Sequence, residues 1–426
     1  MSLITHIHAR EVLDSRGQPT VEVEVHAGAV CGRVIVPSGA STGAAEAREL
    51  RDDDADRYDG RGVRQAVANV NTIIAPRLIG RDPADQRGVD EQLLALDDSP
   101  QKTKLGGNAL LGVSLAAAHA GAAVKGVPLF RHFHELFACD STAAPPPPPR
   151  LPLPMVNMIS GGLHAGGNLD FQDVLIEPVG AADYATGLEW IVRVYRRLGT
   201  LLSQAGYEGR LVGDEGGYGP RLKDNREAVQ FVVRAIEAAQ LRPGDDVTIA
   251  LDVAASHFFD PASQTYRLAA EGDRRLTSGE MIDRLEAWVG EFPIRSIEDG
   301  LAENDWAGWR ELTRRLGSRV QLVGDDLFAT NPSRVQRGID EHVANSVLIK
   351  VNQIGTLTET FQTMHLARAA GYSRVVSARS GETEDTTIAD LAVGTAAEQI
   401  KIGSIVRSER LAKYNRLLRI AEQLEA

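Results

Sequence analysis

From residue 151 onward the chain repeats one pattern: an apolar strand-like run that ends in polar residues, then a loop, then a helical stretch. Helical stretches such as Ser278–Val289 and Thr356–Ala370 follow the strand-like runs Val247–Asp252, Ile294–Asp299, Val320–Asp326, Ser346–Lys350 and Arg374–Arg379. Apolar strands that alternate with helices are typical of βα units around a parallel sheet. About eight such units fit here, which favours a closed barrel over a doubly wound sheet. We therefore predict an α/β fold with a TIM-type β/α barrel over residues 151–426.

The first 140 residues have a different pattern. Val21, Val23 and Val25 alternate with glutamates, as in a strand with one buried face, and a second apolar run covers Val34–Val36. The remainder is predominantly helical in pattern, including the small-residue stretch Asn108–Lys125. Strands followed by helices indicate an α+β domain, which we assign to residues 1–140.

Five consecutive prolines, Pro145–Pro149, separate the two parts. Proline lacks a backbone donor and favours the extended polyproline II conformation, so residues 141–150 are predicted to form a stiff linker. A proline-rich tract can also be a ligand of an SH3-type domain. The position of this tract between two folded parts favours the linker.

The formal net charge of −12 argues against nucleic acid and anionic membranes as partners, because neither would meet a general basic surface. Cys31 and Cys139 have no CxxC spacing, which argues against a disulfide scaffold and against a thiolate zinc site. The N-terminal residues lack the pattern of a signal peptide, and we expect no apolar run long enough to cross a bilayer. A cytoplasmic protein is therefore expected.

Three acidic residues stand at the ends of predicted strands: Asp252, Glu298 and Asp325. The carboxyl ends of barrel strands converge on one mouth, and hard oxygen ligands from separate strands suit Mg²⁺. One such carboxylate alone would more often cap the helix that follows it. Three of them, two within the acidic pairs Glu298-Asp299 and Asp325-Asp326, indicate a cation site.

The next strand-like run ends in Lys350, a candidate general base. Burial and nearby metal ions would push this lysine towards its neutral amine. The alternative is a structural ion pair with the acidic residues. Further along, Arg379, Ser380 and Lys401 bring a guanidinium, a hydroxyl and an ammonium to the same mouth, which describes a phosphate site.

Two candidates lie earlier in the barrel. Glu215, on an expected strand end flanked by glycines, is a candidate acid. His164 lies in the glycine-rich stretch Gly161–Gly167, which indicates either a loop that closes over substrate or an ordinary flexible turn.

Taken together, these motifs resemble the enolase family, in order and over nearly the whole chain, from about residue 5 to residue 421. The most specific blocks are Ile349–Gly355 and Ser380–Asp385. The others are Asp14–Gly17, Pro37–Gly43, Gly213–Tyr218, Ser296–Gly300, Gly324–Leu327 and Lys401–Gly403. The resemblance implies an N-terminal α+β domain that caps a β/α barrel of enolase type. It also implies that the opening strands of this barrel depart from regular alternation, and that the protein forms a homodimer or higher homo-oligomer.

The resemblance also implies two Mg²⁺ ions at each active site. The implied ligands are Asp252, Glu298 and Asp325 for the first ion, and Ser41 as a contributor to the second. Lys350 would be the base and Glu215 the acid. The residues implied for substrate binding are His164, Gln172, Asp173, Arg379, Ser380 and Lys401.

The reaction that this resemblance implies is the glycolytic dehydration of 2-phosphoglycerate to phosphoenolpyruvate. Two residues depart from the family pattern: Asp173 stands where a glutamate is usual, and Ala378 stands where a histidine is usual. Smaller departures are Gln18, Ser160 and His257. They leave open an enolase-like synthase of secondary metabolism, such as carboxyphosphonoenolpyruvate synthase of antibiotic biosynthesis, acting on a related phosphorylated or phosphonate carboxylate. An inactive binding or structural homologue is a third alternative, against which the intact acidic trio argues.

Overall fold

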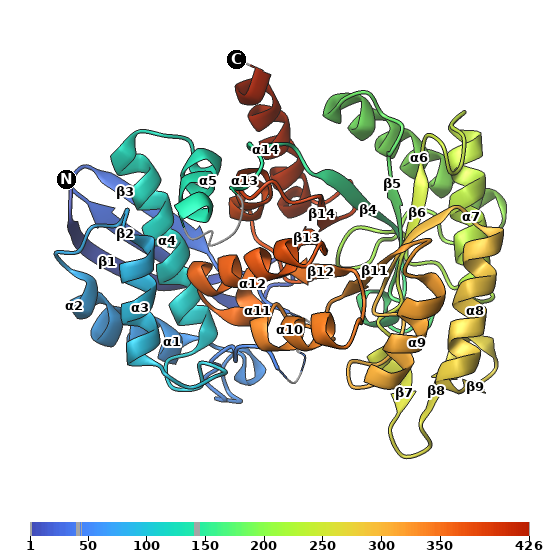
Figure 1. The fold of residues 1–426 in the computed structure, drawn as a ribbon, viewed down its shortest axis with the longest axis horizontal. Coiled ribbons are helices and arrows are strands. Elements are labelled where there is room, and N and C mark those ends of the chain that lie inside the picture. The colour runs from blue at the N-terminus through green and yellow to red at the C-terminus, as the bar shows by residue number, and fades with distance from the viewer. Residues whose placement is uncertain (1, 40–42, 44, 140–144, 426) are drawn as a thin grey trace.

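The computed structural model describes residues 2–39, 43, 45–139 and 145–425 (Figure 1). The N-terminal part forms a three-stranded sheet with helices, and the remainder forms a closed barrel of strands with helices around it. These two parts confirm the predicted fold, a β/α barrel with an N-terminal α+β domain. Residues 145–150 of the predicted linker form neither helix nor strand, and residues 141–144 lie outside the described residues.

The N-terminal sheet is antiparallel, in the order β1-β2-β3. Its strands are β1 (Ile4–Leu13), β2 (Pro19–Ala27) and β3 (Val30–Ile35). The helical segments of this part are η1 (Tyr58–Gly60), α1 (Arg64–Asn69), η2 (Val70–Ile74), α2 (Ala75–Leu78), α3 (Gln86–Leu96), α4 (Gly107–Lys125) and α5 (Leu129–Cys139). The valine alternation and the small-residue stretch therefore predicted β2 and α4, whereas β1 was missed.

Helix α4 packs on one face of this sheet, against β2 and β3. Val21, Val23 and Val25 are completely buried. Small residues allow the close approach, because a Cβ added at Gly32 would lie 2.2 Å from the carbonyl oxygen of Ala116. Alternate residues of β2 carry charged side chains on the other face of the sheet.

Substituting Gly32 with alanine is therefore expected to destabilise the protein. The added methyl group would clash with backbone atoms of α4, which cannot move aside as the end of a flexible side chain could. Overpacking of this kind costs about 1–3 kcal/mol of stability. Gly279→Ala is the matched control, because its added Cβ has no atom within 4 Å and a helical alanine is favoured over glycine. Urea unfolding should show a lower midpoint for Gly32→Ala alone. Equal midpoints for the two variants would contradict the close packing.

Helix α4 also corrects one expectation. By length and composition it is the one described helix that is long and apolar enough to cross a membrane, although 83% of the stretch is buried inside the protein. A buried core helix has this same composition, and α4 occupies that position here.

The barrel closes in the order β4-β5-β6-β10-β11-β12-β13-β14, with β14 paired to β4. Its strands are β4 (Leu153–Ser160), β5 (Asp173–Glu177), β6 (Thr248–Asp252), β10 (Ile294–Glu298), β11 (Gln321–Gly324), β12 (Ser346–Ile349), β13 (Ser373–Ser377) and β14 (Gln399–Gly403). A small antiparallel sheet follows β6 and consists of β7 (Phe259–Asp260), β8 (Thr265–Leu268) and β9 (Arg274–Leu276).

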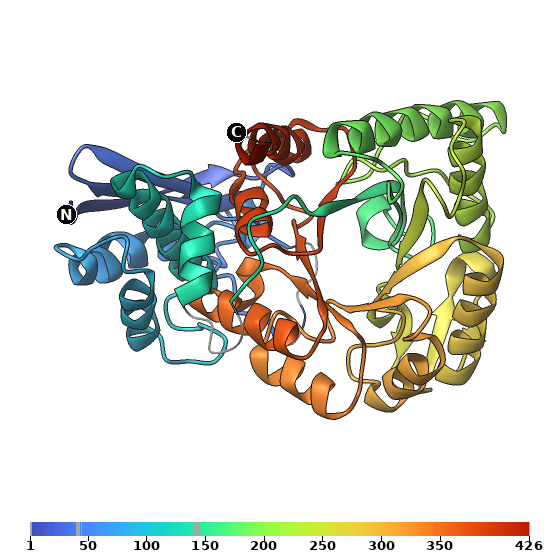
Figure 2. The ribbon, with the colours of Figure 1, turned by 45° about the horizontal axis from the view of Figure 1, so that its top comes forward.

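Helices surround these strands, as Figure 2 shows from α6 in green to α14 in red. They are α6 (Tyr184–Gln204), α7 (Asn225–Ala238), α8 (Ser278–Glu291), α9 (Trp306–Leu316), α10 (Pro332–Asp340), α11 (Val351–Ile354), α12 (Leu357–Ala369), α13 (Thr387–Gly394) and α14 (Ser408–Glu425). The short segments η3 (Gly162–Ala165), η4 (Ala255–Phe258) and η5 (Ala269–Glu271) lie in loops. Side-chain caps begin several of the long helices, for example a complete capping box of Thr277 and Glu280 at α8.

One strand departs from eight regular βα units. β5 runs antiparallel to both β4 and β6, and two helices, α6 and α7, follow it in succession. The irregular opening implied by the family resemblance is therefore present. The reversal matters for function, because the first residue of β5 lies at the same barrel end as the last residues of its neighbours.

Candidate active site

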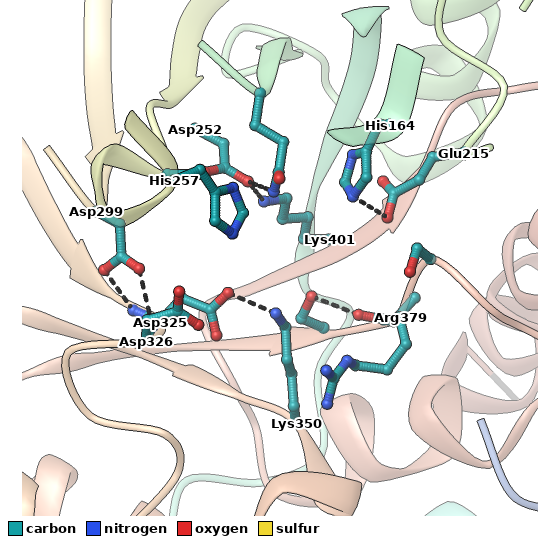
Figure 3. A pocket seen from close by; sticks show the side chains of 15 residues that line it. His164, Glu215, Asp252, His257, Asp299, Asp325, Asp326, Lys350, Arg379 and Lys401 are labelled. Carbon is teal, nitrogen blue, oxygen red and sulfur yellow. Dashed lines mark hydrogen bonds and ion pairs between the residues drawn. The ribbon is translucent and has the colours of Figure 1, made fainter. Parts of the chain in front are cut away.

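The strand ends bring charged side chains to one mouth of the barrel (Figure 3). Asp252 and Glu298 are the last residues of β6 and β10, while Asp325 and Lys350 directly follow β11 and β12. Nine predicted site residues line one cavity there: His164, Gln172, Glu215, Asp252, Asp325, Lys350, Arg379, Ser380 and Lys401. The cavity is also lined by residues that were not assigned a role: Ala254, His257, Asp299, Asp326, Ser377 and Ala378.

The reversed strand β5 brings two further predicted residues to this mouth. Asp173 pairs in register with Asp252, and the Gln172 amide donates to Asp252 Oδ2 at 3.0 Å. Asp173 itself is 1% exposed and lies behind the cavity wall. Its carboxylate accepts a hydrogen bond from the Asn157 amide and lies 3.0 Å from His164 Nδ1. Asp173 therefore contacts the site through His164.

Two of the predicted metal ligands share one ammonium group. Lys401 Nζ lies 2.7 Å from Asp252 Oδ2 and 2.8 Å from Glu298 Oε2. Glu298 is buried beside the cavity. Burial, followed by the charge of Asp252, raises the pKa of Glu298 well above its usual range. The single positive charge of Lys401 therefore does not neutralise both Asp252 and Glu298.

A second acidic group joins Asp325 to Asp299 and Asp326, two residues that were not assigned a role from the sequence. One oxygen each of Asp299, Asp325 and Asp326 lies within 4.8 Å of the others. Asp299 accepts backbone hydrogen bonds from Asp325 at 3.0 Å and Asp326 at 2.8 Å. Burial, followed by the charge of Asp325, raises the pKa of Asp326 to about 7. The acidic pairs visible in the sequence were the signal for these residues.

These carboxylates fit Mg²⁺. They are hard oxygen donors from separate strands, buried close together. Burial and the charge of Asp252 raise the pKa of Glu298. Burial acts in the same direction on Asp252 and Asp325, but the charges of Lys401 and Lys350 lower the pKa values of these two carboxylates, which keeps them in the anionic form that binds a cation. Asp252, Glu298 and Asp325 would hold the ion. Ser41, the predicted contributor to a second ion, lies outside the described residues.

Lys350 corrects the prediction of a neutral amine. Its Nζ lies 2.5 Å from Asp325 Oδ2. Burial lowers the pKa of Lys350, but the charges of Asp325 and Glu298 together outweigh burial and leave the pKa above its usual value. The ion pair that the sequence left as an alternative is therefore present.

Glu215 lies in the loop between α6 and α7, and this placement corrects the prediction of a strand end. Its Oε1 is 3.9 Å from Nε2 of His164, which lies in η3. Burial would raise the pKa of Glu215, but the charge of His164 and then Arg410 lowers it. Burial would lower the pKa of His164, whereas Asp173 and Glu215 raise it to about 9. His164 therefore carries a positive charge at neutral pH, as an anion-binding group requires.

The N-terminal domain closes the other side of the site. Arg379 Nη1 lies 3.1 Å from Glu46 Oε2 and 2.8 Å from the Asn352 side-chain oxygen. Arg16 donates to Ser380 Oγ at 3.3 Å, and Ser38 pairs with Gly381 through their backbones. The predicted phosphate-binding pair therefore depends on both domains.

Two family models match the chain. The model described as the N-terminal domain of enolase matches residues 4–133, and the model described as the C-terminal TIM barrel domain of enolase matches residues 149–426. Together they span nearly the whole chain, and they agree with the two folded parts and with the acidic barrel mouth. The chain therefore belongs to the enolase family.

Proposed function

We propose that this protein is a Mg²⁺-dependent lyase that dehydrates 2-phosphoglycerate to phosphoenolpyruvate. The observation that carries the proposal is the arrangement of Lys350 and Glu215, which reach one cavity from different elements and share its lining with Lys401 and several carboxylates (Figure 3). A proton next to a carboxylate is weakly acidic, and hydroxide is a poor leaving group. Elimination of water therefore needs both a base and an acid at one site.

The roles follow from the positions of these groups. Lys350 would take the proton from C2, and Lys401 would stabilise the negative charge that develops on the substrate carboxylate. Glu215 would then donate a proton to the departing 3-hydroxyl. Mg²⁺ held by Asp252, Glu298 and Asp325 would stabilise the same negative charge as a Lewis acid. Arg379, Ser380 and His164 would bind the phosphate.

The pKa shifts described above favour the ammonium form of Lys350 and the carboxylate form of Glu215. These are the forms that the two groups have after the elimination. They are also the forms required for the reverse reaction, in which Glu215 would activate water and Lys350 would protonate C2. Both directions therefore use the same pair.

The direct test is an assay of the purified protein with Mg²⁺ and 2-phosphoglycerate. We expect an increase in ultraviolet absorbance as the enol phosphate forms, and identification of phosphoenolpyruvate by mass spectrometry. A protein that is folded and binds Mg²⁺ but gives no enol product would contradict the proposed substrate.

The second candidate is a synthase that acts on a related phosphorylated or phosphonate carboxylate. Two observations favour it. Ala378 lines the cavity with a methyl group alone, and the short carboxylate of Asp173 reaches the site only through His164. Compared with a site that has glutamate and histidine at these two positions, this site offers a substrate more room and fewer hydrogen-bonding groups.

The double substitution Asp173→Glu with Ala378→His discriminates between the two candidates. If 2-phosphoglycerate is the substrate, the natural residues support its turnover, and we expect the double variant to be no faster. Hydrogen bonds to charged groups are worth about 1.5–3 kcal/mol each, so restoring one or two would raise a deficient rate by roughly tenfold to ten-thousandfold. Steady-state kinetics on both proteins, with thermal unfolding as the folding control, would reveal such a rise. A gain of this size would favour the synthase.

A further inference from the structure

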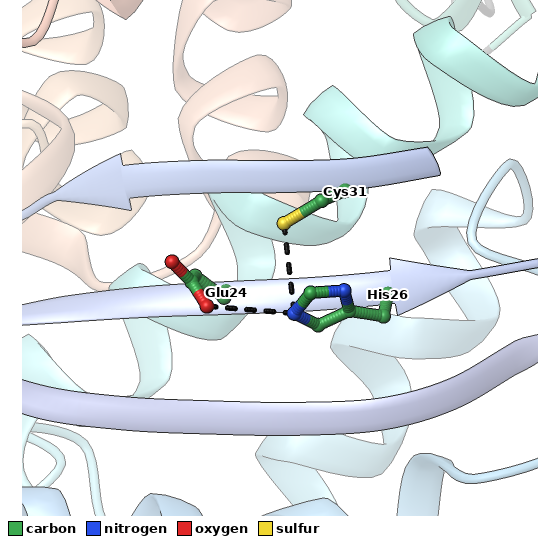
Figure 4. A group of neighbouring side chains, drawn as sticks. All are labelled: Glu24, His26 and Cys31. Atoms are coloured by element: carbon green, nitrogen blue, oxygen red, sulfur yellow. Dashed lines mark hydrogen bonds and ion pairs between the residues drawn. The ribbon is translucent and has the colours of Figure 1, made fainter. Parts of the chain in front are cut away.

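The face of the N-terminal sheet opposite α4 gathers several side chains of types that can bind a metal ion, away from the barrel mouth. The register places His26 of β2 between His6 of β1 and Cys31 of β3, and it pairs Glu24 with His8. These side chains lie on the face opposite α4, because buried valines occupy the alternate positions of β2. Figure 4 shows Glu24 and Cys31 both approaching the same ring nitrogen of His26, Nε2.

Three of these residues place ligand atoms close together, and both separations from the His26 nitrogen are those of a tetrahedral zinc site. His26 Nε2 lies 3.4 Å from Glu24 Oε2 and 3.7 Å from Cys31 Sγ, and all three atoms lie within 4.8 Å of one another. Zinc binds nitrogen and oxygen at about 2.0–2.2 Å and sulfur at about 2.3 Å. Tetrahedral angles then give ligand separations of roughly 3.4 Å for nitrogen to oxygen and roughly 3.6 Å for nitrogen to sulfur. The observed separations match both values.

Hydrogen bonding and ion pairing alone explain the separation of His26 from Glu24 less well, whereas 3.7 Å is an ordinary hydrogen-bond distance between Cys31 and His26. A charged nitrogen–carboxylate hydrogen bond is usually about 2.7–2.9 Å long, shorter than the contact from His26 to Glu24. Arg10 and Arg33 approach Glu24 Oε1, at 3.0 and 2.9 Å, and leave Oε2 facing His26. The two guanidinium groups hold the carboxylate in place, while the negative charges of Glu24 and of a Cys31 thiolate would offset the charge of a cation.

We propose that Glu24, His26 and Cys31 form a binding site for a divalent cation of the zinc class. Water could fill the fourth coordination position, because Cys31 is exposed to solvent. Binding would release the thiol proton of Cys31 to solvent. The cation would link β2 to β3 beside their two-residue turn. The soft sulfur and imidazole ligands distinguish this site from the oxygen-only barrel mouth, so Mg²⁺ would not compete for it.

The sequence gives no paired-cysteine signal for this site. The ligands instead follow the spacing Glu-x-His-x₄-Cys across a hairpin. Only the register of β2 and β3 brings His26 opposite Cys31.

Cobalt is a suitable probe, because thiolate ligation gives Co²⁺ a charge-transfer absorption in the near ultraviolet. The full-length protein would be titrated with Co²⁺ in excess Mg²⁺, which occupies the oxygen ligands. We expect a thiolate band that saturates at one equivalent, is displaced by Zn²⁺ and is absent from Cys31→Ser. Cys139→Ser is the matched control, because Cys139 is the other exposed cysteine and its substitution should leave the band unchanged. His26→Ala should weaken Co²⁺ binding by roughly tenfold or more, since even changes behind a ligand cost about 10–100-fold.

A second measurement needs no substitution. Zn²⁺ should slow the alkylation of Cys31 by a maleimide by roughly tenfold or more, as followed by mass spectrometry, because a metal-bound thiolate is a poorer nucleophile. Cys139 should react at an unchanged rate in the same sample. The proposal is overturned if no thiolate band forms, if the band persists in Cys31→Ser or disappears in Cys139→Ser, or if Zn²⁺ leaves the alkylation of Cys31 unchanged.

Discussion

Lys350→Ala is expected to lower the turnover of 2-phosphoglycerate by roughly a thousandfold or more, because proton transfer by a positioned side chain contributes about 10²–10⁴-fold. The variant should also stop the exchange of the C2 proton with deuterated solvent, which NMR of the substrate measures. Binding should persist, because Arg379, Ser380 and Lys401 remain. In this variant Asp325 loses its ion pair but keeps one hydrogen bond, from the side-chain amide of Gln353 at 2.9 Å.

Glu215→Gln supplies the contrast for this result. Glutamine keeps the size of the side chain but cannot donate the proton that the leaving hydroxyl needs. Dehydration should therefore fail while some exchange at C2 continues, since deprotonation comes first. Equal loss of exchange in both variants would show that the acid and base roles are assigned to the wrong residues.

The second large effect concerns the metal. Asp325→Ala should abolish turnover and the response to Mg²⁺, because this carboxylate is both a proposed metal ligand and the partner of Lys350. The wild-type protein should lose activity in excess EDTA and regain it when Mg²⁺ is restored. Mg²⁺ titrations of the rate and of thermal stability would measure both effects.

A buried carboxylate elsewhere separates the loss of metal from a loss of folding. Asp390 is 1% exposed and is paired with Arg416, as Asp325 is paired with Lys350. Removing one partner of a buried pair costs about 3–5 kcal/mol, so Asp390→Ala should also lower stability. It should keep the Mg²⁺ requirement and the catalytic rate of the folded fraction. Full wild-type turnover in excess EDTA would exclude the proposed metal chemistry.

Most of the barrel could be predicted because its parallel strands are short apolar runs followed by helices. The direction of β5 could not be read from its own residues, since an apolar run of five residues gives the same pattern in either direction. The length of the segment between β4 and β5 indicates the direction of β5. Between β4 and β5 the chain has only the short η3, whereas a parallel crossover usually needs a longer segment with a helix. β1 was missed because its register shifts between Ile4 and His6, which breaks the alternation that marks a strand.

The charged residues at the barrel mouth were predictable from their places at strand ends. The protonation states of these residues could not be predicted from the sequence. The direction of the pKa shift at Lys350 depends on the distance to Asp325, which no spacing in the sequence gives. The contacts of Glu46 and Arg16 with the site could not be predicted either, because their partners are 333 and 364 residues away in the sequence.

That last separation has a consequence for how the protein is made. Ribosomes add about 5–20 residues per second, so roughly 20 to 70 s pass between the synthesis of Arg16 and that of Ser380. A nascent chain that has reached Lys350 already contains Asp252, Glu298 and Asp325, yet it lacks Arg379, Ser380 and Lys401. Such a chain holds the acidic residues of the site and His164, but it lacks the other two groups proposed to bind the phosphate. Substrate therefore cannot assist the folding of the barrel until nearly all of the polypeptide has been synthesised.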